Sequence, residues 1–157
     1  MKRYGPLIAV PEALAVGDPG RWHLRLTPEG VLHRNGADLS ALYAWEQVSR
    51  MDLDLRTTRF RYPGLLGTIG LGILTAVAQD NLGIDPDDGA VDLVIDGEPL
   101  RLTVGRHHVG GYWERTVRGA QRMLDHLLRN PQQRSLFAHP EALVELAARM
   151  ARQADDA

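Results

Sequence analysis

The sequence predicts an α+β fold, in which a mostly antiparallel β sandwich or partial barrel is capped by a C-terminal α-helix. Residues 21–105 hold short runs in which every second side chain is apolar, the pattern of half-buried strands. After Gly110 and Gly111, the apolar side chains recur at helical spacing over residues 112–129. At 157 residues, with 44% hydrophobic and 24% charged side chains, the chain is long enough to bury one core.

The first hairpin is predicted at residues 22–34. In WHLRL the apolar side chains alternate with His and Arg, so they share one face of a strand. TPEG then forms a turn, VLHR returns as the second strand, and Asn35 and Gly36 mark another turn. Residues 1–20, which are rich in proline and glycine, are interpreted as an irregular N-terminal arm.

Further strands are predicted in the middle of the chain. LSALYA forms a short strand that runs into a tight turn at residues 45–48, and SRMDLDL alternates as a longer strand. The longer strand is expected to end near Thr57 and Thr58, because continuing its alternation would bury arginines without partners. VDLVI and PLRLTV flank an Asp-Gly pair and predict a final hairpin at residues 91–104.

The closing helix gathers its apolar side chains into one stripe. This stripe consists of Trp113, Val117, Ala120, Leu124, Leu127 and Leu128. Two later prolines suit the first position of a helix, so a short helical extension is predicted at residues 131–153. Residues 1–157 are therefore interpreted as one domain, with a core at residues 21–130 that contains an insertion at residues 62–90.

Residues 22–130 resemble the pleckstrin-homology-like (PH-like) domain proteins of bacteria. The resemblance rests on the hairpin WHLRLTPEGVLHRNG, the phrase YAWEQVSRMDLDL and the closing helix GGYWERTVRGAQRMLDHLLRN. Tyr43, Trp45 and Val48 fit the aromatic-x-Trp-x-x-Val pattern that often leads into a long strand in such proteins. The resemblance implies two packed sheets and a binding or scaffold module. It does not imply phosphoinositide recognition, because the first hairpin lacks clustered lysine and arginine.

The composition excludes several classes of function. A net charge of −2 gives no field that would draw the protein onto nucleic acid. The absence of cysteine excludes disulfides, thiolate catalysis and cysteine-bound metals. No phosphate-binding glycine motif occurs, so no cofactor is predicted. The N-terminus does not match a secretory signal, and we expect a cytoplasmic protein, with attachment to a membrane surface as the alternative.

The most suggestive combination of residues is an arginine cluster followed by an uncharged, glycine-rich segment. Guanidinium groups bind phosphates, and an apolar loop behind them can enter a bilayer interface. Because Pro63 and four glycines interrupt the uncharged run, we do not expect it to span a membrane as a helix. The candidate binding residues are Arg56, Arg59, Arg61, Leu65, Leu66 and Ile69.

Three functions are consistent with these patterns. The first is a non-enzymatic interaction or scaffold module that binds a protein partner or a second copy of itself through residues 63–79, which fit neither strand nor helix pattern. The second is a peripheral membrane protein that uses the arginine cluster and the apolar loop. The third is an enzyme with a site near Arg106, His107 and His108. Adjacent histidines on a strand point to opposite faces, so no metal site is predicted there.

Two carboxylates also share one face of a predicted strand. Asp52 and Asp54 are spaced as some catalytic carboxylate pairs are. Arg50 and Arg56 flank them on the same face, which favours a solvated stripe of paired charge over a catalytic pair.

Overall fold

The computed structural model describes residues 2–58, 88–106 and 111–156. The larger sheet consists, in spatial order, of β1 (Arg3–Tyr4), β2 (Leu7–Val10), β3 (Ala13–Gly17), β4 (Trp22–Leu26), β5 (Gly30–Asn35) and β6 (Asp38–Ala44). The smaller sheet consists of β10 (Glu98–Val104), β9 (Gly89–Ile95) and β7 (Val48–Asp54). All pairs within these two sheets are antiparallel.

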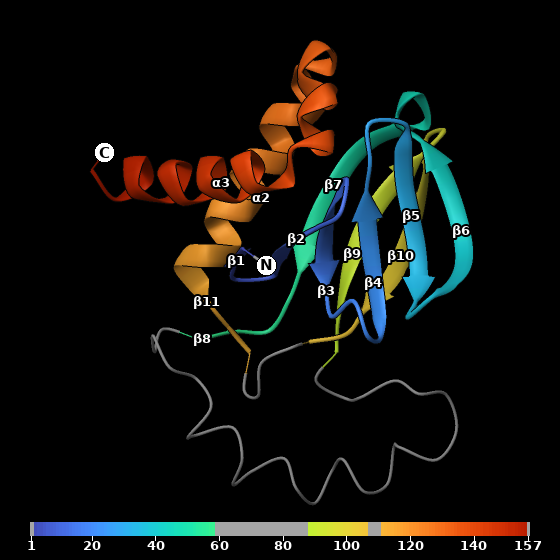
Figure 1. Ribbon diagram of the computed structural model, residues 1–157, viewed down its shortest axis with the longest axis horizontal. Helices are drawn as coiled ribbons and strands as arrows, with labels where there is room; N and C mark the ends of the chain where they lie inside the picture. Colours follow the sequence, from blue (N-terminus) through green and yellow to red (C-terminus); the bar gives the residue numbers. More distant parts are fainter. Residues whose placement is uncertain (1, 59–87, 107–110, 157) are drawn as a thin grey trace, which may run out of the picture.

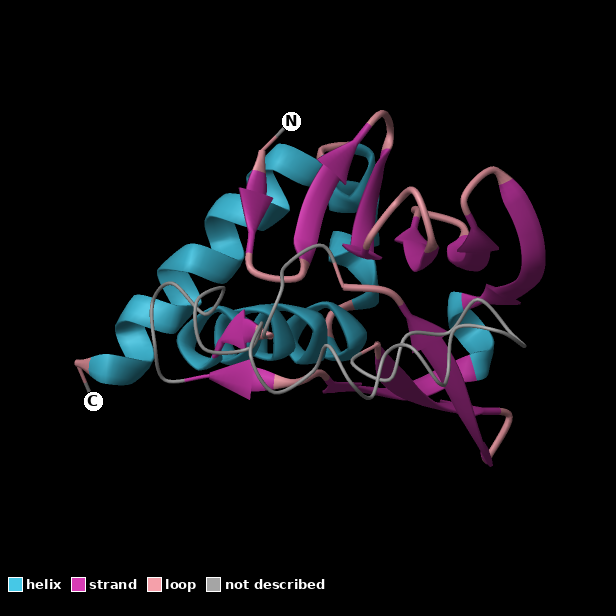
Figure 2. Cartoon of the chain, turned by 90° about the horizontal axis from the view of Figure 1, so that it is seen from below, coloured by secondary structure: helices cyan, strands magenta, loops and turns pink. Residues whose placement is uncertain are grey.

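The C-terminal helices follow a short parallel strand pair. This pair joins β8 (Thr57–Thr58) to β11 (Tyr112–Trp113). The helical elements are η1 (Trp45–Gln47), α2 (Glu114–Arg129), η2 (Pro131–Ala138) and α3 (Pro140–Asp155). Figure 1 shows α2 and α3 at one end of the sheets and β6 at the opposite end, and Figure 2 shows the same separation from below.

The predicted fold class is confirmed. The protein is α+β, with two antiparallel sheets in a sandwich-like arrangement and helices at the C-terminal end, and the described sheets do not close into a barrel. Both predicted hairpins form: β4 pairs with β5, and β9 pairs with β10 across Asp96 and Gly97. These two residues have positive φ angles of 50° and 82°, as the tight hairpin turn requires.

The prediction of an irregular arm at residues 1–20 is wrong. This segment supplies β1, β2 and β3, and every residue of β3 is buried. Pro11 and Glu12 form the turn between β2 and β3, with Glu12 at φ 59°. On the outer face, the Arg25 guanidinium donates to the carbonyl oxygen of Pro11 (2.6 Å). LIAV and ALAV lack alternation because these strands are buried on both faces.

Two other predicted boundaries shift. The closing helix begins at Glu114 instead of residue 112, because Tyr112 and Trp113 pair with β8 as a short strand. The predicted insertion at residues 62–90 overlaps the sheet, since β9 begins at Gly89. The helical extension is confirmed, and its last helix is 16 residues long.

The two sheets and the helices share one core. Trp45 of η1 contacts two other parts of this core. Its ring stacks on Phe137 of η2 with centroids 4.9 Å apart, and its indole N–H donates to the carbonyl oxygen of Thr27 (2.7 Å). The helices approach each other closely at Gly119, where an added Cβ would lie 2.6 Å from the backbone oxygen of Ala147. On its other side, α2 packs beside β7 of the smaller sheet.

Candidate interaction site

Most residues of the predicted binding cluster lie outside the described part of the chain. Arg59, Arg61, Leu65, Leu66 and Ile69 belong to this group, together with the whole glycine-rich segment. Arg56 is described and exposed, between β7 and β8.

The region of the third hypothesis is described only in part. His107 and His108 lie outside the described residues. The backbone N–H of Arg106 donates to the carboxylate of Asp88 (3.4 Å). The same carboxylate, 1% exposed, accepts two hydrogen bonds from the guanidinium of Arg21 (2.8 and 3.0 Å). In the described ranges Asp88 thus joins the starts of β4 and β9 to the end of β10, which is a structural role.

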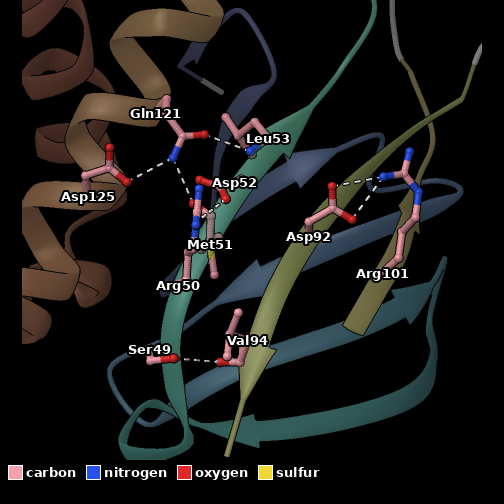
Figure 3. A network of polar contacts seen from close by, with 10 residues as sticks. All are labelled: Ser49, Arg50, Met51, Asp52, Leu53, Asp92, Val94, Arg101, Gln121 and Asp125. Carbon is pink, nitrogen blue, oxygen red and sulfur yellow. Dashed lines mark hydrogen bonds and ion pairs between the residues drawn. The ribbon is translucent and has the colours of Figure 1, made fainter. Parts of the chain in front are cut away.

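The free edge of β7 is closed by a side chain from α2. The Gln121 amide nitrogen donates to the carbonyl oxygen of Met51 (2.8 Å), and its oxygen accepts from the backbone N–H of Leu53 (2.7 Å). The amide is held by a further hydrogen bond to Asp125 (2.9 Å). Figure 3 shows Gln121 beside the strand, where it occupies the place of a neighbouring strand. The edge therefore has no backbone pairing to offer at these two residues.

The outer face of the smaller sheet carries paired charges. Arg50 pairs with Asp52 (2.5 Å), and Arg101 of β10 pairs with both Asp92 (2.9 Å) and Asp54 (2.6 Å). Figure 3 shows the contacts that Arg50 and Arg101 make with Asp52 and Asp92. The predicted stripe of cross-paired charge is confirmed, although Arg101 is the partner of Asp54. Each carboxylate is paired with a guanidinium, so the two aspartates of β7 do not form an isolated acid pair.

Two more edges are protected. β10 carries Glu98, Pro99 and Arg101, and proline and charge both discourage strand addition. The chain beyond β10 also turns onto the larger sheet, where the N–H of Gly105 donates to the carbonyl oxygen of Trp22 (2.6 Å). β1 is only two residues long and lies against α3.

β6 differs from these edges. It is the terminal strand of the larger sheet, and no described strand pairs with its outer side. Leu39 and Leu42 are 57% and 60% exposed, and they are the exposed large hydrophobic side chains of the described residues. Residues 39–44, LSALYA, contain neither charge nor proline. Of the usual protective features, β6 has a single bulge and one charged residue, Asp38, at its start.

The bulge determines where the leucines point. Leu42 pairs with Leu32 and Leu39 pairs with Arg34, and these two β5 residues are two positions apart. Leu32 and Arg34 therefore point to the same face of the sheet. Their partners Leu42 and Leu39 point to that face too, even though the two leucines are three positions apart. The extra residue is Ser40, because Ala41 pairs with His33. The two leucines and the half-buried Leu32 thus form one apolar patch at the edge.

Two histidines of the larger sheet are buried, His23 and His33, and the pKa of His23 is shifted. His23 of β4 is 4% exposed, and its Nδ1 lies 3.0 Å from the carbonyl oxygen of Arg21. Burial lowers the pKa of His23 below its ordinary value, and the nearby guanidinium groups of Arg34 and Arg25 act in the same direction. The neutral imidazole is therefore the form that the folded protein prefers.

Neither a metal cluster nor a membrane-spanning helix is found in the described ranges. Within them, no three histidine or acidic side chains are gathered as metal ligands would be. No described helix has both the length and the apolar character needed to cross a bilayer.

No protein-family model, curated protein or solved structure matches this chain. The resemblance to PH-like domains therefore stays a prediction. Of the described sheet edges, β6 is the one that is neither short, covered nor interrupted by proline, and its charged residue, Asp38, lies at its very start.

Sequence reasoning identified β6 as a strand but missed its exposed leucines. Part of the signal was present, because Leu39 and Leu42 are three positions apart and point to opposite faces of a regular strand, which leaves one of them on the outer face. Only the paired register shows that a bulge places both of them on the outer face.

Proposed function

We propose that this protein is a non-enzymatic interaction module that self-associates by pairing the β6 edges of two copies. The observation that carries the proposal is the contrast between β6, with its exposed leucines and its uncharged run at residues 39–44, and the protected edges β1, β7 and β10. An unprotected edge presents backbone N–H and C=O groups that another strand can pair with.

A second copy is the occupant that the chemistry of β6 favours. Antiparallel pairing about a two-fold axis places the outer faces of both sheets on the same side, so the leucine patches meet. Leu39 of one copy then packs against Leu42 of the other, and by symmetry Leu42 of the first copy packs against Leu39 of the second. No charge lies within residues 39–44, so the close approach of two identical strands brings no like-charge repulsion.

The expected dimer is weak and depends on concentration. Burying a fully exposed leucine contributes about 1.5–3 kcal/mol, and each copy contributes two leucines that are already partly covered. Association costs at least about 4 kcal/mol in lost translational and rotational freedom. The bulge at Ser40 shortens the regular ladder, so the leucine contacts supply much of the affinity.

The test is a charge-complementation experiment followed by sedimentation equilibrium over a wide concentration range. We expect the unchanged protein to dimerise, and Leu39→Glu and Leu42→Lys each to be monomeric, because each buries a charge against a leucine. A mixture of the two variants should form a heterodimer. In it, the carboxylate introduced into one copy faces the ammonium group introduced into the other, and the second leucine contact stays intact.

The matched control is Gln153→Lys, which adds a positive charge to an exposed position of α3, far along the chain from β6. It should dimerise like the unchanged protein. A protein that stays monomeric at all concentrations, or a dimer that survives both leucine substitutions, would overturn the proposal. A mixture that fails to associate would overturn the leucine register.

The prediction that residues 63–79 mediate self-association needs its own variant, because those residues lie outside the described part of the chain. Gly70→Asp introduces a charge into that segment without changing β6. If it abolishes the dimer while the leucine variants keep it, the glycine-rich segment and not β6 is the contact.

A further inference from the structure

We infer that α2 presents a second binding surface, which docks onto an anionic phospholipid bilayer. This arginine face consists of Arg118, Arg122 and Arg129. These three are the exposed residues of α2, and every other residue of the helix is buried or half-buried. All three of the fully exposed positions of α2 are therefore arginine, which calls for an explanation beyond ordinary solubility.

The three side chains point in nearly the same direction. At about 100° per residue, positions 118, 122 and 129 fall within about 40° of one another around the helix axis. At about 1.5 Å per residue, they extend over about 16 Å along the helix. The three arginines therefore follow one line along the helix. Asp125 lies on the same line, but it is half-buried and its carboxylate accepts a hydrogen bond from Gln121.

α3 shows what an ordinary solvated helix looks like in the same molecule. Its exposed charges include both signs: Glu141 and Glu145 lie in its first half, and Arg149 and Arg152 lie in its second half. That distribution complements the helix dipole, which favours acidic residues near the N-terminus and basic residues near the C-terminus. α2 also has an acidic residue, Glu114, in its first turn and Arg129 in its last, but Glu114 is half-buried and none of the exposed side chains of α2 is acidic.

The arginine face does not stabilise the fold through ion pairs. None of its three guanidinium groups pairs with a carboxylate of the described residues, whereas Arg115 pairs with Asp155 (2.8 Å). Arg118 and Arg122 are four residues apart, a spacing at which like charges cost an isolated helix a few tenths of a kcal/mol. The nearby carboxylate of Asp125 is already held by Gln121 (2.9 Å).

A flat anionic surface fits this arrangement better than a nucleic acid. A plane laid against a straight, convex helix touches all three guanidinium groups at once, and each basic residue near an anionic bilayer contributes about 1 kcal/mol. Trp113, at the N-terminal end of α2, suits a membrane interface, where tryptophan is enriched. Its ring lies under the guanidinium of Arg115, 5.7 Å from the ring centroid, so it offers no open platform for a nucleic-acid base.

The experiment measures sedimentation of the full chain with vesicles of phosphatidylcholine and phosphatidylserine at low salt. We expect binding that falls as salt is added and that is absent from vesicles of phosphatidylcholine alone. Arg118→Gln with Arg122→Gln should lower the partition coefficient about 30-fold, the equivalent of about 1 kcal/mol for each arginine.

The matched control is the double substitution Arg149→Gln with Arg152→Gln on α3. It removes the same charge from exposed positions of a neighbouring helix and should leave binding close to that of the unchanged protein. Circular dichroism shows that both double variants remain folded. Failure of the unchanged protein to bind at low salt, or an equal loss in both variants, would overturn the inference. Tighter binding to single-stranded RNA that requires the same arginines would assign the face to nucleic acid instead.

Discussion

β7 and β6 are both terminal strands of their sheets, but in the described part of the chain only the edge of β7 is covered by another element. β7 lies beside α2, and the Gln121 amide satisfies one N–H and one C=O of its edge. β6 lies at the end of the sheets opposite α2 and α3 (Figure 1), and it exposes two leucines beside an unpaired edge. The edges of these sheets are thus protected by neighbouring elements, and β6, which has no described element against its outer edge, is the strand that a partner can pair with.

The largest expected effect comes from moving the helix that closes the β7 edge. Gly119→Val places new atoms against the Ala147 backbone oxygen, which already lies 2.6 Å from an added Cβ, and so forces α2 away from α3. We expect the free energy of unfolding to fall by about 3 kcal/mol in urea titration. Hydrogen exchange should also become faster at the Leu53 amide. Ala142→Val, at an exposed position of α3, is the control and should change stability little.

The next effect isolates the edge contact itself. Gln121→Leu keeps the size of the side chain but removes the partners of the Leu53 N–H and the Met51 carbonyl oxygen. We expect the free energy of unfolding to fall by about 2 kcal/mol, because polar backbone groups are left unsatisfied beside the helix. Gln153→Leu makes the same change at an exposed position. Equal stability of the two variants would show that closing the β7 edge contributes nothing.

The sequence predicted the parts of the fold that follow local rules. Alternation and an Asp-Gly turn were enough for the hairpin of β9 and β10, and helical periodicity identified α2 within two residues. β2 and β3 escaped detection because strands buried on both faces show no alternation, and Pro11 resembled a loop signal. Burial on the second face depends on tertiary neighbours, which no local pattern encodes.

For the candidate site, the sequence predicted the strands and the helix but not how they are arranged around it. β6 was expected as a strand, but its position at the end of the sheet follows from the added strands β1 to β3 on the other side and from the turn into β7. The exposure of Leu39 depends on a bulge that appears only once β5 and β6 are in register. In the sequence Gln121 is an ordinary polar residue of a helix. It can bind the edge of β7 only because the fold places α2 beside that strand.

A smaller effect on stability, with a large effect on assembly, is expected at β6. Leu39→Lys with Leu42→Lys replaces two exposed side chains, so the free energy of unfolding of the monomer should change by less than about 0.5 kcal/mol for each substitution. Dimerisation, measured by light scattering after size-exclusion chromatography, should be lost. A variant that unfolds much more easily would show that the leucines belong to the core and not to an interface.

The smallest expected effect separates the interior of the larger sheet from its edge through pH. Because burial lowers the pKa of His23, the unfolded chain binds the proton more readily than the folded protein does. The stability contributed by the neutral ring is fully present above about pH 6.5, the ordinary histidine value, and is lost as the pH falls from there toward the lowered pKa of the folded state. His23→Asn, which keeps a donor for the Arg21 carbonyl oxygen, should flatten that part of the stability curve.

The β6 edge carries no histidine, so the dimer dissociation constant should stay constant over the same range while stability declines. A dissociation constant that follows the stability curve would mean that the edge and the interior respond to protonation as one unit.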